Sequence, residues 1–153
     1  MEIVITTEKL LTDDLAQVLQ AHWLFCTSYS PIEHAYVLDA SKLFSPDITV
    51  FGARIDGELV GVGAMRRLDV DHAELKSMHT LAKSRGLGVG KAMVAHIEDF
   101  ARSSEIKRIS LETGTNEAFK PARELYNSLG YQSCEAFGDY VLSEDNMCMT
   151  KLI

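Results

Sequence analysis

A glycine-rich turn between a predicted strand and a predicted helix has the chemistry of an anion site. Backbone N–H groups converge at the N-terminus of a helix, and glycines let a ligand approach the backbone closely. Basic side chains at Lys83, Arg85 and Lys91 add positive charge to this part of the chain. The pattern predicts that a phosphate or pyrophosphate binds the turn formed by Arg85, Gly86, Leu87, Gly88, Val89, Gly90 and Lys91.

Two common phosphate-binding loops do not fit this turn. A P-loop requires a glycine, four residues and then Gly-Lys-Ser/Thr, but Gly90-Lys91 is followed by Ala92, and Arg85 stands where the first glycine should be. A dinucleotide fingerprint requires GxGxxG after the first strand of a parallel unit, and Lys91 or Met93 would occupy the third glycine position. A nucleotide-binding protein is therefore kept only as a third possibility, behind the two functions described below.

Two carboxylates near the turn are candidates for proton transfer. Glu74 has the same strand parity as Lys76, Met78 and Thr80 in the run that precedes the turn, so we expect these side chains to lie on one side of that strand. A carboxylate there would take a proton from an attacking ammonium, directly or through water. Glu112, on the neighbouring predicted strand, is the competing candidate for this role.

The elements that position these groups are expected to form a single domain over residues 1–153. Hydrophobic periodicity predicts helices that begin near Thr12, Ser30, Val89 and Asn116. Asp56-Gly57 predicts a tight hairpin turn. Strands are predicted at residues 3–7, 48–55, 59–68, 73–81 and 108–113, with two more in 131–153 that are broken near 143–146. This order is typical of an α/β fold in which a mixed sheet carries helices on both faces.

Three features together resemble the GNAT family of acyltransferases. The segment Arg85–Gly90 is similar to the family's Arg-x-x-Gly-x-Gly signature for acetyl-CoA, and the predicted order of elements resembles the GNAT fold along nearly the whole chain. Residues Leu125–Tyr131 resemble the family's ending of the last helix. The segments Glu74–Met78, Leu111–Gly114 and Phe119–Tyr126 further resemble a bacterial subgroup of small GNAT proteins, the YsnE type. The resemblance implies a central, mostly antiparallel mixed sheet with helices on both faces.

The resemblance also implies an activity, which is direct transfer of an acetyl group from acetyl-CoA to a primary amine of a small molecule or peptide. N–H groups from Leu87 to Lys91 would hold the pyrophosphate, and backbone groups of Met78 and Thr80 would pair with the pantetheine arm. Met78 would also polarise the thioester carbonyl. Tyr126 would protonate the leaving thiolate, with a core tyrosine as the alternative, and Glu74 would serve as the base.

The sequence departs from the family pattern at two positions. Ala82 replaces a common proline, and Phe119 replaces an asparagine that contacts the cofactor in many members. Asn116, one turn earlier, is therefore a candidate cofactor contact together with Phe119. The early helical region usually walls the acceptor site in this fold, so His34 and Tyr36 are candidate acceptor contacts, and Glu112 on the neighbouring predicted strand is a third.

The charge and the cysteine content limit which classes of partner and which cellular compartment are expected. With 15 basic and 22 acidic residues the formal net charge is −7, which disfavours nucleic acid and anionic membranes as partners, yet residues 75–97 contain no acid. Cys26, Cys134 and Cys148 form no CxxC pair, and no metal-ligand spacing occurs. Free thiols and the absence of a signal-like N-terminus or a long apolar stretch favour a cytoplasmic protein.

A second function class remains open at this stage. A non-catalytic acyl-CoA-binding regulatory module would keep the glycine-rich turn but would need neither Glu74 nor Tyr126. The sequence does not specify the acceptor, the length of the acyl chain or the oligomeric state, a homodimer included.

Overall fold

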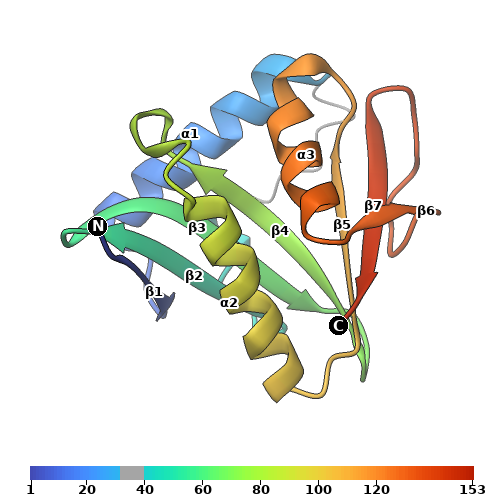
Figure 1. Cartoon of the computed structure of the whole chain (residues 1–153), viewed down its shortest axis with the longest axis horizontal. Helices are drawn as coiled ribbons and strands as arrows, with labels where there is room; N and C mark the ends of the chain where they lie inside the picture. Colours follow the sequence, from blue (N-terminus) through green and yellow to red (C-terminus); the bar gives the residue numbers. More distant parts are fainter. Residues whose placement is uncertain (32–39) are drawn as a thin grey trace.

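The computed structural model describes residues 1–31 and 40–153, in which seven strands form one sheet with helices on both faces (Figure 1). The strands are β1 (Ile3–Glu8), β2 (Ile48–Ile55), β3 (Glu58–Arg67), β4 (His72–Thr80), β5 (Arg108–Gly114), β6 (Gln132–Cys134) and β7 (Asn146–Leu152). Their order across the sheet is β1-β2-β3-β4-β5-β7-β6. All neighbours are antiparallel except β4 and β5, which run parallel. The predicted mixed, mostly antiparallel sheet is confirmed.

The two longest described helices cover opposite faces of this sheet. Helix α1 (Asp13–Tyr29) packs on the face that carries Val50, and helix α2 (Val89–Ser103) packs on the face that carries Phe51. Adjacent strand residues point to opposite faces, so each helix has its own core cluster. The remaining helical elements are α3 (Lys120–Ser128) and the short 3-10 turns η2 (Ala40–Lys42), η3 (Ala82–Ser84) and η4 (Glu117–Phe119). No helix within the described ranges is long and apolar enough to span a membrane.

Local sequence signals explain most of these elements. Asp56 and Gly57 both adopt positive φ, at 51° and 80°, and so form the predicted two-residue turn between β2 and β3. Gly130, at φ 96°, follows the end of α3 as predicted. The predicted last helix divides into η4 and α3, and the break between the final strands is longer than predicted, covering residues 135–145. The helix expected to begin at Ser30 falls largely on residues 32–39, outside the described residues.

The two parallel strands separate soon after they meet. β4 and β5 pair only at His72↔Arg108, Ala73↔Ile109 and Glu74↔Ser110. Beyond these pairs β4 continues to Thr80 and β5 to Gly114 without bonding to each other, and Figure 1 shows the strands running apart. The sheet is therefore open between β4 and β5 along more than half of each strand.

A β-bulge at Ser77 changes which way the end of β4 faces. Lys76 pairs with Ala64 of β3, whereas His79 pairs with Val62, so two residues of β4 lie opposite Gly63. Ser77 adopts a φ of 56°, which accommodates the extra residue. Glu74 and Lys76 consequently lie on the α1 face, Met78 and Thr80 on the α2 face, and His79 on the α1 face. The prediction that Glu74, Lys76, Met78 and Thr80 share one side is wrong from Ser77 onward, because it assumed unbroken alternation.

Candidate active site

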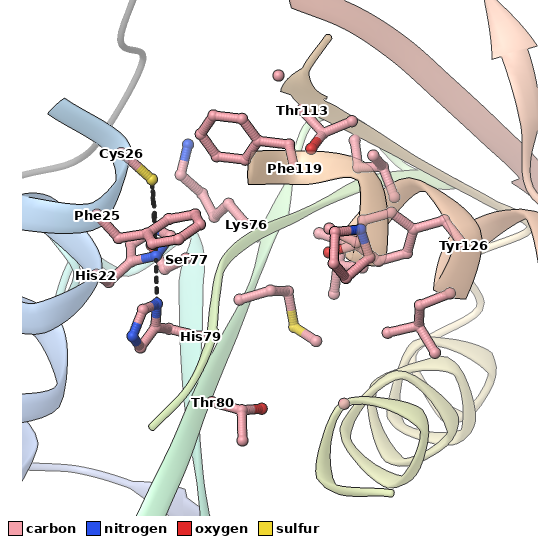
Figure 2. Close-up of a pocket in the computed structure, with 18 of the residues that line it drawn as sticks. His22, Phe25, Cys26, Lys76, Ser77, His79, Thr80, Thr113, Phe119 and Tyr126 are labelled. Atoms are coloured by element: carbon pink, nitrogen blue, oxygen red, sulfur yellow. Dashed lines mark hydrogen bonds between the residues drawn. The ribbon is translucent and has the colours of Figure 1, made fainter. Parts of the chain in front are cut away.

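One cavity of about 440 Å³ occupies the opening between β4 and β5. Its walls come from α1, the turn before α2, η4 and α3, and its floor from the two strands (Figure 2). It brings together the predicted site residues Glu74, Met78, Thr80, Arg85, Gly86, Gly88, Val89, Gly90, Lys91, Glu112, Phe119 and Tyr126. His34 and Tyr36, the predicted acceptor contacts, lie outside the described residues. The cavity thus joins the glycine-rich turn to the two candidate carboxyl groups.

The glycine-rich turn presents free N–H groups to this cavity. Gly86 and Gly88 adopt φ values of 79° and 87°, a region that side chains strain, so glycine is favoured at both positions. Gly88 is the N-cap of α2 and no side chain caps the helix. The first N–H groups of α2 therefore have no acceptor within the helix, and they form a site for an anion. Leu87 points its side chain outward, 45% exposed, so it can contribute only its backbone.

Arg85 is fixed at the end of β4, whereas Lys83 is engaged elsewhere. The Arg85 Nε donates to the Thr80 carbonyl at 3.3 Å, and its guanidinium lies 5.3 Å from the centre of the Phe25 ring. Lys83 instead forms an ion pair with Glu58. Of the basic residues named from the sequence around the turn, Arg85 and Lys91 line the cavity and Lys83 does not.

Tyr126 is both a core residue and a cavity residue. It is 6% exposed and packs edge-on against Tyr131 with ring centres 5.9 Å apart. Its hydroxyl forms no hydrogen bond with any residue in the described part of the chain, and its side chain lines the cavity (Figure 2). Burial raises the pKa of this phenol above its usual range. The group therefore carries its proton at neutral pH, as an acid must.

The two candidate carboxyl groups have different surroundings. Glu74 is 2% exposed, accepts a hydrogen bond from the Tyr140 hydroxyl and has the Lys76 Nζ 3.5 Å from its Oε2. Glu112 accepts from Asn146 Nδ2 at 3.0 Å. Burial raises the pKa of Glu112 to about 7; the Asn146 bond opposes the rise, and the charge of Glu74 adds to it. A carboxyl group with that pKa exchanges protons readily near neutral pH.

The cavity also contains residues that were not predicted as part of the site, among them three from α1 and one from the long segment before β7. His22, Cys26 and Phe25 come from α1, and Tyr140 comes from the segment between β6 and β7. His22 and Cys26 are four residues apart and so share one face of α1, and the polar atoms on that otherwise apolar face were the available signal. Tyr140 reaches Glu74 from 66 residues away, so no local pattern indicates it.

His79 packs against α1 and also lines the cavity (Figure 2). The Nδ1 atoms of His22 and His79 are 3.3 Å apart. Burial lowers the pKa of His22 to about 3 and that of His79 to about 4. Both rings are consequently neutral near pH 7, so this wall of the cavity carries no charge from histidine.

Phe119 lines the cavity, whereas Asn116 lies outside it. The Phe119 ring covers Gly114, where any side chain would collide with it, and meets the Phe25 ring with centres 5.3 Å apart. Phe119 thus forms an apolar wall of the cavity. Asn116 lies outside the cavity, where its Oδ1 accepts from the Ala118 N–H at 3.0 Å and its amide donates to the Tyr29 carbonyl. The expectation that Asn116 replaces the missing asparagine is not supported, because capping η4 already occupies its side chain.

Comparison with known proteins is consistent with this geometry. Residues 15–131 match the Acetyltransferase (GNAT) family. The chain is 39% identical to the uncharacterized N-acetyltransferase YsnE of Bacillus subtilis, over 96% of this chain and 97% of that protein. It is 38% identical to the uncharacterized N-acetyltransferase YedL of Escherichia coli, over 86% of each chain.

A solved structure shows the same arrangement of elements. It is that of a Klebsiella pneumoniae protein assigned as an acyl-CoA N-acyltransferase, which is 25% identical and superposes with a TM-score of 0.84, covering 98% of this chain and 97% of the other. The fold, the match over most of the chain and the similarity of the relatives agree with one another, and the chain belongs to the GNAT family of acetyltransferases.

Proposed function

We propose that this chain transfers the acetyl group of acetyl-CoA to a primary amine of a small molecule or peptide, by direct attack of the amine on the thioester. The observation that carries the proposal is the cavity that joins the open N-terminus of α2 to the two carboxyl groups through the gap in the sheet. A cofactor with a pyrophosphate at one end and a thioester at the other matches that path. Three free cysteines support a reducing, cytoplasmic location.

The cofactor would be bound mainly by backbone groups. N–H groups from Leu87 to Lys91 would hold the pyrophosphate, with the charges of Arg85 and Lys91 nearby. The pantetheine arm would lie between β4 and β5, where the backbone of Met78 and Thr80 has no partner on β5. The gap in the sheet therefore supplies hydrogen-bonding groups without needing specific side chains.

The chemical step needs one proton acceptor and one proton donor. The amine nitrogen would attack the thioester carbonyl, whose oxygen is polarised by the Met78 N–H, and give up a proton to a carboxylate. The tetrahedral intermediate would then break its C–S bond, and Tyr126 would protonate the sulfur to release CoA and the amide. Solvent exchange returns the proton from the carboxyl group and reprotonates Tyr126.

The surroundings of the two carboxyl groups favour Glu112 over Glu74 as the base. Glu74 accepts from the Tyr140 hydroxyl at Oε2 and has the Lys76 Nζ 3.5 Å from the same oxygen, so that oxygen is already engaged by the protein. Glu112 has one amide partner and a pKa of about 7, which balances deprotonation against basicity at neutral pH. Glu74 is the base favoured by sequence parity; in this proposal it instead positions Tyr140 and Lys76 beside Glu112.

Binding and turnover can be measured on the same preparations. We expect calorimetry to show acetyl-CoA binding, and thiol release to depend on an added amine. Gly88→Glu would abolish binding because its carboxylate fills the anion site. Gly88→Asn is the matched control, because asparagine tolerates positive φ and adds no charge. Binding without thiol release for every amine tested would favour the regulatory module, and tighter binding of ATP or NAD than of CoA would overturn the cofactor assignment.

A further inference from the structure

Lys76 is a buried cation in the wall of the cavity. It lies on β4 just before the bulge, on the α1 face, and its side chain is only 9% exposed. Figure 2 shows this side chain extending along the cavity toward the side where Cys26 and Phe119 lie. A lysine is rarely buried to this extent without a partner that matches its charge.

The contacts of Lys76 within the described residues leave most of its donors unused. A lysine ammonium has three N–H donors, and the only contact found for Lys76 is the 3.5 Å approach to Glu74. Charge-assisted bonds between ammonium and carboxylate are shorter, about 2.7–2.9 Å. Lys151 provides the comparison in the same protein, because it contacts both oxygens of Glu98 at 3.1 and 2.9 Å. The ammonium of Lys76 therefore retains capacity for a second anion.

The other cations that line the cavity are placed for a different task. Arg85 is bound to the Thr80 carbonyl and stacked on Phe25, and Lys91 lies in the first turn of α2. His22 and His79 are neutral near pH 7, as their low pKa values show. Among the described residues, Lys76 is thus the cation that stands beside the two carboxyl groups.

A ligand that satisfies this end of the cavity needs two opposite charges. Its amine belongs next to Glu112, which takes the proton, and an anionic group belongs next to Lys76. A simple amine would leave the buried ammonium without its second partner, and a buried donor left without a partner is unfavourable. An amine that also carries a carboxylate, as an amino acid does, meets both requirements within a short molecule.

We propose that Lys76 binds the carboxylate of the acceptor, so that the enzyme selects amino acids over amines that lack a carboxylate. This inference rests on the proposed acetyl transfer at the same site. Lys76 is a specificity-determining residue in this scheme, and the apolar wall of Phe25 and Phe119 receives the acceptor's side chain.

The test compares acceptors that differ only by the carboxylate. Leucine is paired with 3-methylbutylamine and phenylalanine with 2-phenylethylamine, and kcat/KM is measured with acetyl-CoA by thiol release. The wild type should prefer the amino acid of each pair by about tenfold or more. In Lys76→Met this ratio should fall by about the same factor, chiefly through a higher KM for the amino acid. Lys120→Met, which changes an exposed lysine on α3, is the matched control and should keep the wild-type ratio.

The outcomes separate the two proposals. Thiol release with the simple amines at least as fast as with the amino acids, or an unchanged ratio in Lys76→Met, would overturn the inference and leave acetyl transfer standing. No release with any amine would instead remove the proposed function. If Lys76→Met fails to fold, calorimetry on the CoA-loaded wild type decides, because leucine should bind and 3-methylbutylamine should bind more weakly by about tenfold. Equal binding of the two contradicts the role of Lys76.

Discussion

Two clusters in this protein use the same three residue types with different results. Glu98, Lys151 and Tyr131 meet under α2, and Glu74, Lys76 and Tyr140 meet in the cavity. In the first cluster Lys151 contacts both carboxylate oxygens and Tyr131 donates at 2.9 Å. In the second, Lys76 approaches a single oxygen at 3.5 Å.

The difference between the clusters lies in what is left unsatisfied. Glu98 is surrounded by donors, with Arg102 as a further cation at 3.9 Å. The cavity cluster adds a second carboxyl group, Glu112, which has one amide partner and a raised pKa. Burial of a glutamate is therefore not by itself a sign of chemistry. A shortage of partners next to an open cavity is the better sign, since a fully satisfied group has nothing to offer a substrate.

The largest effect that separates the clusters should come from Glu112→Gln. Replacing the base by an amide of the same shape should lower kcat by about 10²–10⁴-fold, the range of general-base catalysis. Amine-dependent thiol release measures it, with acetyl-CoA binding as the check that the cofactor site is intact. Glu98→Gln serves as the matched variant and should retain wild-type kcat. A comparable loss of kcat in both variants would remove the distinction.

Glu98→Ala should have the opposite profile. It leaves Lys151 and the Tyr131 hydroxyl without their partner, and breaking such a buried pair costs about 3 kcal/mol or more in the free energy of unfolding. Denaturant titration measures the loss, and kcat per folded molecule should stay unchanged. Asp99→Ala, one residue along α2 at an exposed position, should change the free energy by less than about 0.5 kcal/mol. A stable Glu98→Ala protein would show that this cluster is not structural.

Tyr126, the proposed proton donor, and Tyr131, which belongs to the Glu98 cluster, can be compared in the same way. Tyr126→Phe removes a hydroxyl that has no partner among the described residues, so kcat should fall by about 10²-fold, the lower limit for acid catalysis. Acetyl-CoA affinity should change little. Tyr131→Phe removes a hydroxyl bonded to Glu98 and should lower stability by about 1–2 kcal/mol with kcat retained. Equal kcat in Tyr126→Phe and the wild type would return Tyr126 to a purely structural role.

A further difference should appear as a pH dependence of stability. The pKa of Glu112 rises from an ordinary 4.5 to about 7 on folding, so the folded state holds its proton more tightly than the unfolded state. The contribution of Glu112 to the free energy of unfolding is therefore present in full below pH 4.5 and is lost as the pH rises to about 7. Glu112→Gln lacks that loss, so its stability relative to wild type should increase across this window and level off above it. Unfolding curves at several pH values measure the difference, and a flat difference would contradict the raised pKa.

Much of the fold follows from local sequence. Asp56-Gly57 specifies its turn by conformation alone, and Val89, Met93 and Ile97 repeat at the helical period that α2 buries. The glycine-rich turn was likewise predictable, because its function depends on consecutive residues and on positive φ at glycine. Signals of this kind survive in the sequence because a few neighbouring residues contain all of the required information.

The rest of the site depends on contacts that no local pattern encodes. Serine has no preference for the φ of 56° found at Ser77, so the bulge that places Met78 on the face opposite Lys76 could not be foreseen. Tyr140 reaches Glu74 from a segment with little regular structure. The unequal surroundings of Glu74 and Glu112 follow from that contact, which is why sequence parity alone ranked the two carboxyl groups differently.

The opening between β4 and β5 has a further consequence for how the molecule behaves in a crowded solution. Strand edges with unpaired backbone groups invite strands of other molecules, and proteins usually have to blunt them. Here two such edges face each other inside a cavity walled by α1 and α3. That space has a volume of about 440 Å³. The fold thus keeps these unpaired backbone groups inside the cavity, where a ligand can bind them, and away from the outer edges of the sheet at β1 and β6.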